Sequence, residues 1–225
     1  MIGFVGFWEI LFARLPSFLP YLLRGAVVTL EITAATLAVA VILGLALAVM
    51  QRTRARFVAT TARAYIEVMR SIPVLTTLFV IYFGLAYLGI QLPSFVAAVI
   101  ALGMLGGSYM AEIIRAGIDA VHVGQREAAM SLGMTPTQAM RFIVLPQALR
   151  VIVAPTANYT IGLLKDTAIV STVAAPELLF AAKTLVSQTI LPMQVYVLTA
   201  SIYFLMSWPL ARAARHLEIR LSRGV

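Results

Sequence analysis

The chain contains no cysteine among its 225 residues, and it is poor in charge. Without cysteine it can form neither disulfide bonds nor thiolate metal sites. Charged residues make up 12% of the chain and hydrophobic residues 61%, whereas a soluble domain usually carries about 25% charged residues. This composition excludes an ordinary soluble domain and predicts an integral, all-α membrane protein forming one domain over residues 1–225.

The motifs of a self-sufficient ATPase or metalloenzyme are also missing. The sequence has no G-x-x-x-x-G-K-[ST] phosphate-binding loop and no Gly-Lys pair from which to build one. Its two histidines, His122 and His216, are isolated, and we expect surface residues without catalytic or metal-binding roles. The net charge of +8 comes from short groups between apolar segments, with no basic stripe interleaved with aromatics. We therefore expect no enzyme activity, no cofactor bound by this chain and no nucleic-acid partner.

What the sequence does contain is a series of apolar runs near the roughly 20 residues that a membrane span needs. A polar helical stretch, TARAYIEVMRS, precedes the second run, and the fourth is interrupted by Pro155 and by the adjacent pair Lys165-Asp166. The opening stretch, rich in Phe and Trp, is typical of a short segment at the membrane interface. The five predicted transmembrane helices are 25–50, 72–88, 94–114, 146–170 and 192–210.

Arginine is distributed unevenly between the two sides that five spans define. The side opposite the N-terminus carries twelve arginines, against Arg14, Lys183 and Arg24 on the other side. Because basic residues gather on the cytoplasmic side, the N-terminus is predicted outside, the C-terminus inside and the loop 119–145 in the cytoplasm. The twelve are Arg52, Arg54, Arg56, Arg63, Arg70, Arg115, Arg126, Arg141, Arg212, Arg215, Arg220 and Arg223.

The loop 119–145 has the pattern of two short helices joined by a glycine. Residues 125–132 can form about two helical turns, and Gly133 suits the left-handed cap that ends a helix. Thr135 is a good N-cap before Pro136, and Gln138 completes a capping box. Taken alone, the pattern fits either an amphipathic loop on the membrane surface or a docking element whose small alanines let another protein approach.

Ionisable residues inside predicted spans need partners, because each costs about 2.5–3.5 kcal/mol on insertion scales. Glu112 and Arg115 are three residues apart and can pair on one helix face, and the same is expected of Arg63, Glu67 and Arg70.

Lys165 and Asp166 are adjacent, so on a helix they point about 100° apart and cannot satisfy each other. A break after them predicts the kind of interrupted helix that forms substrate sites inside membranes. A neighbouring cation and anion would suit an amino-acid zwitterion, with Asn158 two turns earlier. The alternative is that the lysine reaches the interface and the aspartate caps the next helix.

The loop motif EAAMSLG followed by IVLP resembles the EAA signature of ABC importer membrane subunits. Further segments, including RSIPVLTTLFVIYFGL and LLKDTAIVS, are similar to the polar amino acid subfamily of these permeases, and the resemblance covers about residues 22–210. The positions that match the signature are Glu127, Ala128, Ala129, Gly133, Ile143, Leu145 and Pro146.

The resemblance implies a type I (MetI-like) ABC importer permease of the bacterial inner membrane, for amino acids or related small polar compounds. Its partners would be ATPase subunits that bind ATP and Mg, a second permease copy or paralogue, an extracytoplasmic solute-binding protein and membrane lipid. The short loop helix would be the coupling helix that docks on the ATPase. The implied ATPase-coupling residues are Gln125, Glu127, Ala128, Ala129, Gly133 and Pro146.

The LK[DN]T segment is associated in that family with the translocation pathway. Here the sequence departs from many relatives, because Leu105 stands where they carry a polar residue such as Asn or His. The predicted pathway residues are Leu105, Ser108, Asn158, Lys165 and Asp166. Two other functions stay open: an ion-coupled secondary transporter and a non-transporting membrane scaffold.

Overall fold

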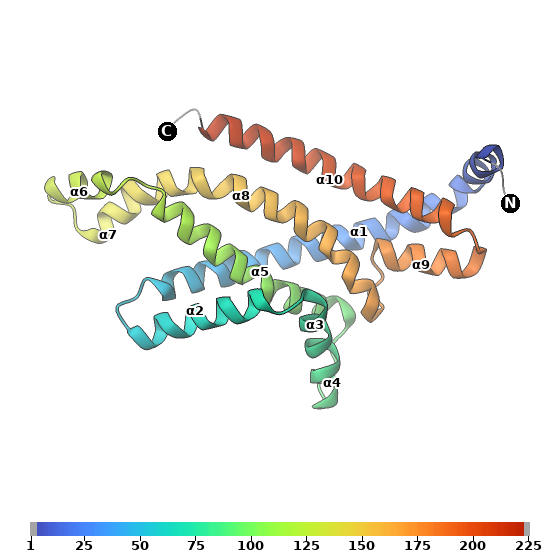
Figure 1. Ribbon diagram of the computed structural model, residues 1–225, viewed down its shortest axis with the longest axis horizontal. Coiled ribbons are helices and arrows are strands. Elements are labelled where there is room, and N and C mark those ends of the chain that lie inside the picture. The colour runs from blue at the N-terminus through green and yellow to red at the C-terminus, as the bar shows by residue number, and fades with distance from the viewer. Residues whose placement is uncertain (1–3, 223–225) are drawn as a thin grey trace.

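The computed structural model describes residues 4–222 and contains no strand within them (Figure 1). Arg223, one of the arginines used to predict orientation, lies outside the described residues. Three irregular helical segments join the α-helices: π-helical turns at Val80–Gly84 (η1) and Met140–Val144 (η2), and a 3-10 helix at Thr167–Val173 (η3). The α-helices are α1 (Phe4–Gln51), α2 (Arg56–Ser71), α3 (Val74–Phe79), α4 (Leu85–Tyr87), α5 (Ser94–Asp119), α6 (Val123–Ser131), α7 (Pro136–Ala139), α8 (Leu145–Asp166), α9 (Leu178–Thr189) and α10 (Pro192–Ser222).

The first helix is much longer than its predicted span. It includes the aromatic opening stretch that the sequence predicted as a separate segment, and Pro16 and Pro20 lie inside it. Each proline removes one backbone hydrogen bond. Burial of Phe18 and Leu22 against α9 and α10 holds this half of the helix in place. The helix therefore begins well before residue 25, because tertiary packing continues it through the prolines.

The predicted span 72–88 is not a straight helix in line with the polar stretch before it. The pair Arg56–Ser71 and Val74–Tyr87 is bent by 106°, so the chain turns away from α2, with Leu78 of α3 buried against α5 and the α4 end extending outward (Figure 1). Ile72 is extended and Pro73 precedes α3, which agrees with the exclusion of helical backbone before proline. Among residues 4–222, four helices are long and apolar enough to cross a membrane, or up to five if this bent pair is one span.

The fourth predicted span contains the break that the sequence placed after Lys165 and Asp166. Helix α8 ends at Asp166, a 3-10 helix follows, and Ala174 adopts a left-handed conformation with φ 57° before α9 begins. Pro155, in contrast, lies inside α8 without ending it. The helix is therefore interrupted after Lys165 and Asp166, where the sequence placed the break, and not at Pro155.

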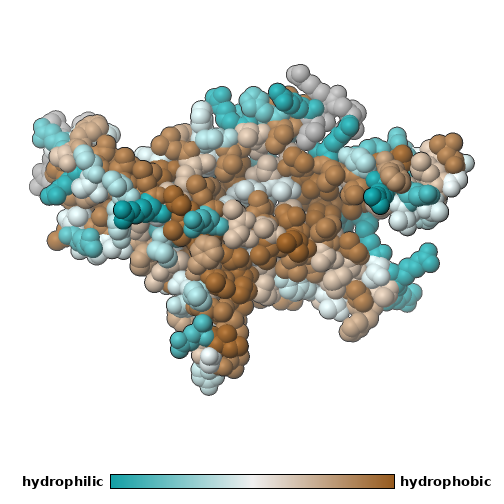
Figure 2. Space-filling model, turned by 180° about the vertical axis from the view of Figure 1, so that it is seen from behind, coloured by the Kyte–Doolittle hydropathy of each residue, from teal (hydrophilic) through white to brown (hydrophobic). Residues whose placement is uncertain are grey.

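Helices α1 and α5 pack closely because small residues separate them. A Cβ on Gly107 would lie 2.6 Å from the side chain of Leu43, and one on Gly103 would lie 2.6 Å from Val39. Such close approach through glycine is typical of helix pairs in membranes, where apolar burial alone gives little preference for protein over lipid. The rear face of the molecule is mostly hydrophobic over its middle, with hydrophilic residues toward the ends (Figure 2).

Candidate functional site

The loop between α5 and α8 lies at one end of the molecule and has the predicted internal structure (Figure 1). Gly133 has φ +85°, and no atom lies within 4 Å of where its Cβ would be, so backbone conformation rather than space requires glycine. The Thr135 hydroxyl accepts a 3.3 Å hydrogen bond from the Gln138 N–H, and the Thr135 N–H donates to Gln138 Oε1 at 2.8 Å. The predicted hinge and capping box are confirmed.

Most of the predicted coupling residues face outward. Gln125, Glu127, Ala128, Gly133 and Pro146 are exposed. The loop therefore offers small and polar groups to another surface along α6 and at the start of α8.

Ala129 differs, since it is 4% exposed and packs inside the loop. Its carbonyl accepts a 3.1 Å hydrogen bond from the Met134 N–H. The Ala129 side chain therefore packs against the rest of the loop, and its predicted coupling role stays a prediction.

Sequence reasoning missed the apolar residues on this loop. Leu132 is 83% exposed and Val123 is 62% exposed. Both lie at the ends of α6, which otherwise carries mostly small and polar residues. The signal was available, because a leucine directly before a left-handed glycine is held at the surface when the helix stops there. The loop therefore presents Leu132 and Val123 at its surface beside its polar groups.

A second candidate site is a cavity of about 460 Å³ among α2, α5 and α8. Leu105 and Asp166 line it together with Arg70, Tyr109 and Tyr159, and so does the bend between α2 and α3. We call it the Asp166 cavity. Its volume lies in the range of about 300–1,000 Å³ that is usual for small-molecule sites.

Three residues of this cavity form a stacked column. The Arg70 guanidinium lies 5.4 Å from the centre of the Tyr109 ring, and the Tyr109 and Tyr159 rings stack with their centres 5.9 Å apart. A Cβ at Gly106 would overlap the Tyr159 hydroxyl, so this glycine makes room for the ring. A guanidinium over an aromatic face is a favourable cation–π arrangement that leaves its N–H groups free for other partners.

The predicted pathway residues do not all reach the cavity. Leu105 and Asp166 line it, whereas Ser108 is fully buried and donates a 2.6 Å hydrogen bond to the Leu105 carbonyl. Asn158 and Lys165 are exposed but do not line it.

The helix period explains this division on α8. Tyr159, Gly162 and Asp166 recur at three- and four-residue spacing on one face, and Asn158 and Lys165 lie one position before Tyr159 and Asp166. Sequence reasoning named Asp166, which lines the cavity, but missed both tyrosines, although Tyr159 precedes Asp166 by two turns.

An ion-pair network lies beyond the cavity toward the loop end. Arg115 contacts Glu112 at 2.8 Å and Asp119 at 3.1 Å, and Arg52 contacts Asp119 at 2.7 Å. The predicted Glu112–Arg115 pair is therefore confirmed, with α1 joined to it through Arg52.

The expected pairing within α2 is wrong. Among the ion pairs of residues 4–222, none joins Glu67 to Arg63 or Arg70. Arg70 instead turns onto Tyr109, which belongs to α5. Helical spacing allowed these ion pairs, but α5 places the Tyr109 ring beside the Arg70 guanidinium.

The two histidines have separate positions. His122 caps α6, and its Nδ1 accepts a 3.1 Å hydrogen bond from the Gly124 N–H. His216 lies on α10 and is exposed. In the part of the chain that the structure describes, no group of three His, Cys, Asp or Glu residues could hold a metal ion.

Comparison with known proteins points in one direction. A family model described as "Binding-protein-dependent transport system inner membrane component" matches residues 40–223. The chain is 38% identical over 196 residues to the probable glutamine ABC transporter permease protein GlnM of Bacillus subtilis, covering 87% of this chain and 91% of the relative. It is 34% identical over 210 residues to the glutamate/aspartate import permease protein GltK of Escherichia coli, covering 90% and 94%.

Solved structures agree with the sequence relatives. The crystal structure of an amino acid ABC transporter with histidines is similar to this chain with a TM-score of 0.89 and 38% identity, covering 93% of this chain and 98% of that one. An inward-facing structure of the MetNI methionine ABC transporter has a TM-score of 0.69 at 22% identity, covering 88% of this chain and 97% of that one. The second likeness concerns the fold alone.

Proposed function

Because the chain belongs to the family of binding-protein-dependent transport system inner membrane components, we propose that it forms the translocation pathway of an ATP-driven amino acid importer. As a member of this family it is a multi-pass ABC permease of the inner membrane with the all-helical MetI-like fold. Its relatives are transport components rather than enzymes. Hydrolysis of ATP, with Mg, is assigned to partner ATPase subunits.

The single observation that carries the pathway is the Asp166 cavity. Its charged groups, Arg70 and Asp166, come from different helices, and no ion pair of the described residues joins them. An amino acid carries both complementary charges. Its carboxylate would accept hydrogen bonds from the Arg70 guanidinium, and its ammonium would meet Asp166 beside the Tyr109 ring.

The substrate class follows from this arrangement and from the relatives. At the position where many relatives carry a polar residue, this chain places the apolar Leu105 in the cavity. Recognition in the cavity therefore concerns the zwitterion of the substrate more than a polar substrate side chain. GlnM and GltK are named for glutamine and for glutamate and aspartate. L-Glutamine and L-glutamate are therefore the first substrates to test. Selection among amino acids would fall mainly to an extracytoplasmic binding protein.

Coupling to ATP is assigned to the loop 119–145. Its rigid caps at Gly133 and Thr135 let it transmit force, and its exposed groups supply a docking surface. A second permease, either another copy or a paralogue, would close the open side of the pathway, with the N-terminus outside and the C-terminus inside. Lipid would contact the remaining hydrophobic surface (Figure 2).

Uptake by reconstituted transporter tests the proposal. Proteoliposomes containing the chain with its ATPase and binding protein should accumulate radiolabelled L-glutamine or L-glutamate only when ATP is present on the side of the membrane where the ATPase lies. Asp166→Asn should lower the maximal rate at least roughly tenfold, the effect of losing one charge-assisted contact of about 1.5–3 kcal/mol. Glu218→Gln, an exposed carboxylate on α10, is the matched control and should transport normally.

The two rival functions predict other results. An ion-coupled transporter would take up substrate with the lone chain and an ion gradient, without ATP. A scaffold would bind the ATPase but show equal, background uptake for wild type and Asp166→Asn.

A further inference from the structure

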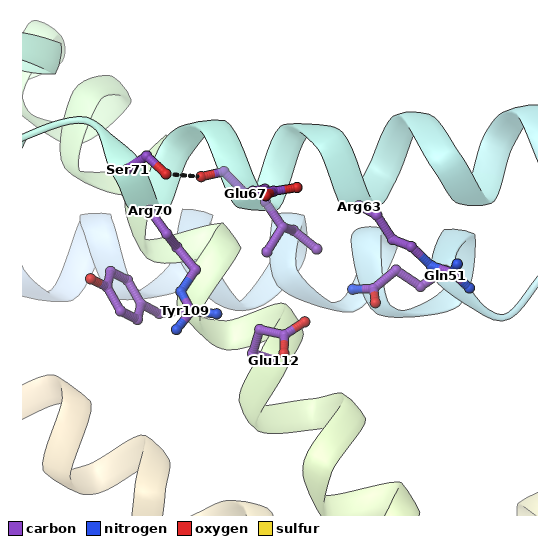
Figure 3. A pocket seen from close by; sticks show the side chains of 8 residues that line it. Gln51, Arg63, Glu67, Arg70, Ser71, Tyr109 and Glu112 are labelled. Carbon is purple, nitrogen blue, oxygen red and sulfur yellow. Dashed lines mark hydrogen bonds between the residues drawn. The ribbon is translucent and has the colours of Figure 1, made fainter.

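A separate cavity of about 390 Å³ lies between α2 and α5, on the loop side of the Asp166 cavity. We call it the Glu67 cavity. Figure 3 shows Arg70 of α2 reaching between Tyr109 and Glu112 of α5, Arg63 pointing toward Gln51 at the end of α1, and Glu67 between the two arginines along α2. The positions 63, 67 and 70 follow helical spacing, so all three side chains leave the same face of α2.

The polar groups of this cavity are incompletely paired. Arg63 and Glu67 take part in none of the ion pairs of the described residues, and Arg70 lies over Tyr109. The Gln51 amide lies beside Glu112, yet its buried Nε2 has no partner that meets hydrogen-bonding distance and angle. A buried amide donor without a partner is uncommon and costs about 1–3 kcal/mol.

This set of groups complements an amino acid. Two guanidiniums suit one or two carboxylates, while Glu67 is available for an ammonium. Arg63 has no counterpart in the Asp166 cavity, so a ligand here gains a second guanidinium. That extra donor favours an amino acid with a carboxylate or amide side chain.

Continuity with the first cavity places the two in sequence. Arg70, Ser71 and Tyr109 line both cavities. With five N–H donors, the Arg70 guanidinium can contact a ligand in each cavity at the same time, and a substrate leaving the Asp166 cavity toward the loop end meets the Glu67 cavity next.

We infer that the Glu67 cavity is a second amino-acid binding station, in which Arg63 and Arg70 hold the carboxylate and Glu67 holds the ammonium of a substrate on its way to release. This inference rests on the proposed function. This second station lies beyond the Asp166 cavity. It assigns ligand contacts to Arg63 and Glu67, which take part in none of the ion pairs of the described residues.

Equilibrium binding of radiolabelled L-glutamate to the full-length chain with its ATPase in nanodiscs tests the number of stations. Wild type should bind two molecules per chain. In Arg63→Gln, the Asp166 cavity should bind one molecule with unchanged affinity, and the affinity of the Glu67 cavity should fall roughly 10- to 100-fold. Arg54→Gln, an exposed arginine in the turn after α1, is the matched control and should bind two. One molecule per wild-type chain, or two in Arg63→Gln with unchanged affinities, overturns the inference.

The absence of cysteine permits a second measurement that locates the ligand. Ser71→Cys places a unique thiol at the junction of the two cavities, and L-glutamate should slow its reaction with a water-soluble maleimide. In an Asp166→Asn background that protection should persist, and adding Arg63→Gln should remove it. Loss of protection with Asp166→Asn alone would leave a single station and contradict the inference, while normal uptake by wild type would leave the proposed function standing.

Discussion

At the scale of single residues, Glu177 shows how a buried charge is tolerated in an apolar protein. Its side chain is fully buried and caps α9 by accepting hydrogen bonds from the N–H groups of Leu179 at 2.9 Å and Phe180 at 2.7 Å. The Tyr203 hydroxyl donates a third, at 2.9 Å. Three donors from two helices satisfy the carboxylate and fix where α9 begins after the break.

Replacing this carboxylate should destabilise the fold. We expect Glu177→Gln to lower the free energy of unfolding by about 1.5–3 kcal/mol, because an amide keeps only one acceptor oxygen and loses the charge that strengthens these bonds. Tyr203→Phe, which removes one donor, should lower it less. Thermal unfolding in a single detergent checks both, and a Glu177→Gln melting temperature equal to wild type would show that the cap contributes little.

At the scale of elements, the loop 119–145 combines a stiff backbone with an exposed apolar tip. Gly133 and the capping box set the angle between α6 and α7, and Ala129 packs inward. Leu132, 83% exposed, stands directly before the hinge. The conformation is thus held by local bonds, while the surface for a partner is left open.

A charge at this tip should weaken docking without disturbing the fold. We expect Leu132→Asp to lower recovery of the ATPase with the tagged chain at least roughly tenfold, since burying an unpaired carboxylate at an interface costs several kcal/mol. Leu217→Asp, at a 41% exposed leucine of α10, is the matched control. Gentle purification from the native membrane supplies the readout, and equal ATPase recovery from both variants would remove Leu132 from the interface.

At the scale of the whole molecule, the contact between α1 and α5 connects the two candidate sites. These helices carry Gln51, Arg52 and Glu112, and α5 continues directly into the loop. Gly107 lets the helices approach, since its missing side chain leaves space that Leu43 fills. Helix α5 therefore connects the loop to both cavities in one continuous element.

Enlarging Gly107 should separate these helices. We expect Gly107→Val to destabilise the protein by about 1–3 kcal/mol, the usual cost of overpacking a tight interface. Leu43→Ala in the same chain should recover part of that loss, because it vacates the space that the new side chain enters. Unfolding of both single variants and the double variant measures the coupling, and strictly additive effects would contradict direct contact.

The sequence by itself determined the class of protein, the loop and the break after Asp166. These depend on local chemistry: apolar composition, a glycine that tolerates positive φ, a capping box and adjacent charges that cannot pair with each other. The loop motifs therefore appear in the structure at the predicted residues.

Only the tertiary structure decided which side chains meet. Helical spacing allowed Arg70 to pair with Glu67, but α5 placed Tyr109 beneath it, and α8 added Tyr159. Packing also continued α1 through two prolines and turned Ser108 and Ala129 inward. Each of these outcomes depends on a neighbour distant in the chain, which neither spacing nor propensity specifies, because burial and close contact are properties of the assembled helices.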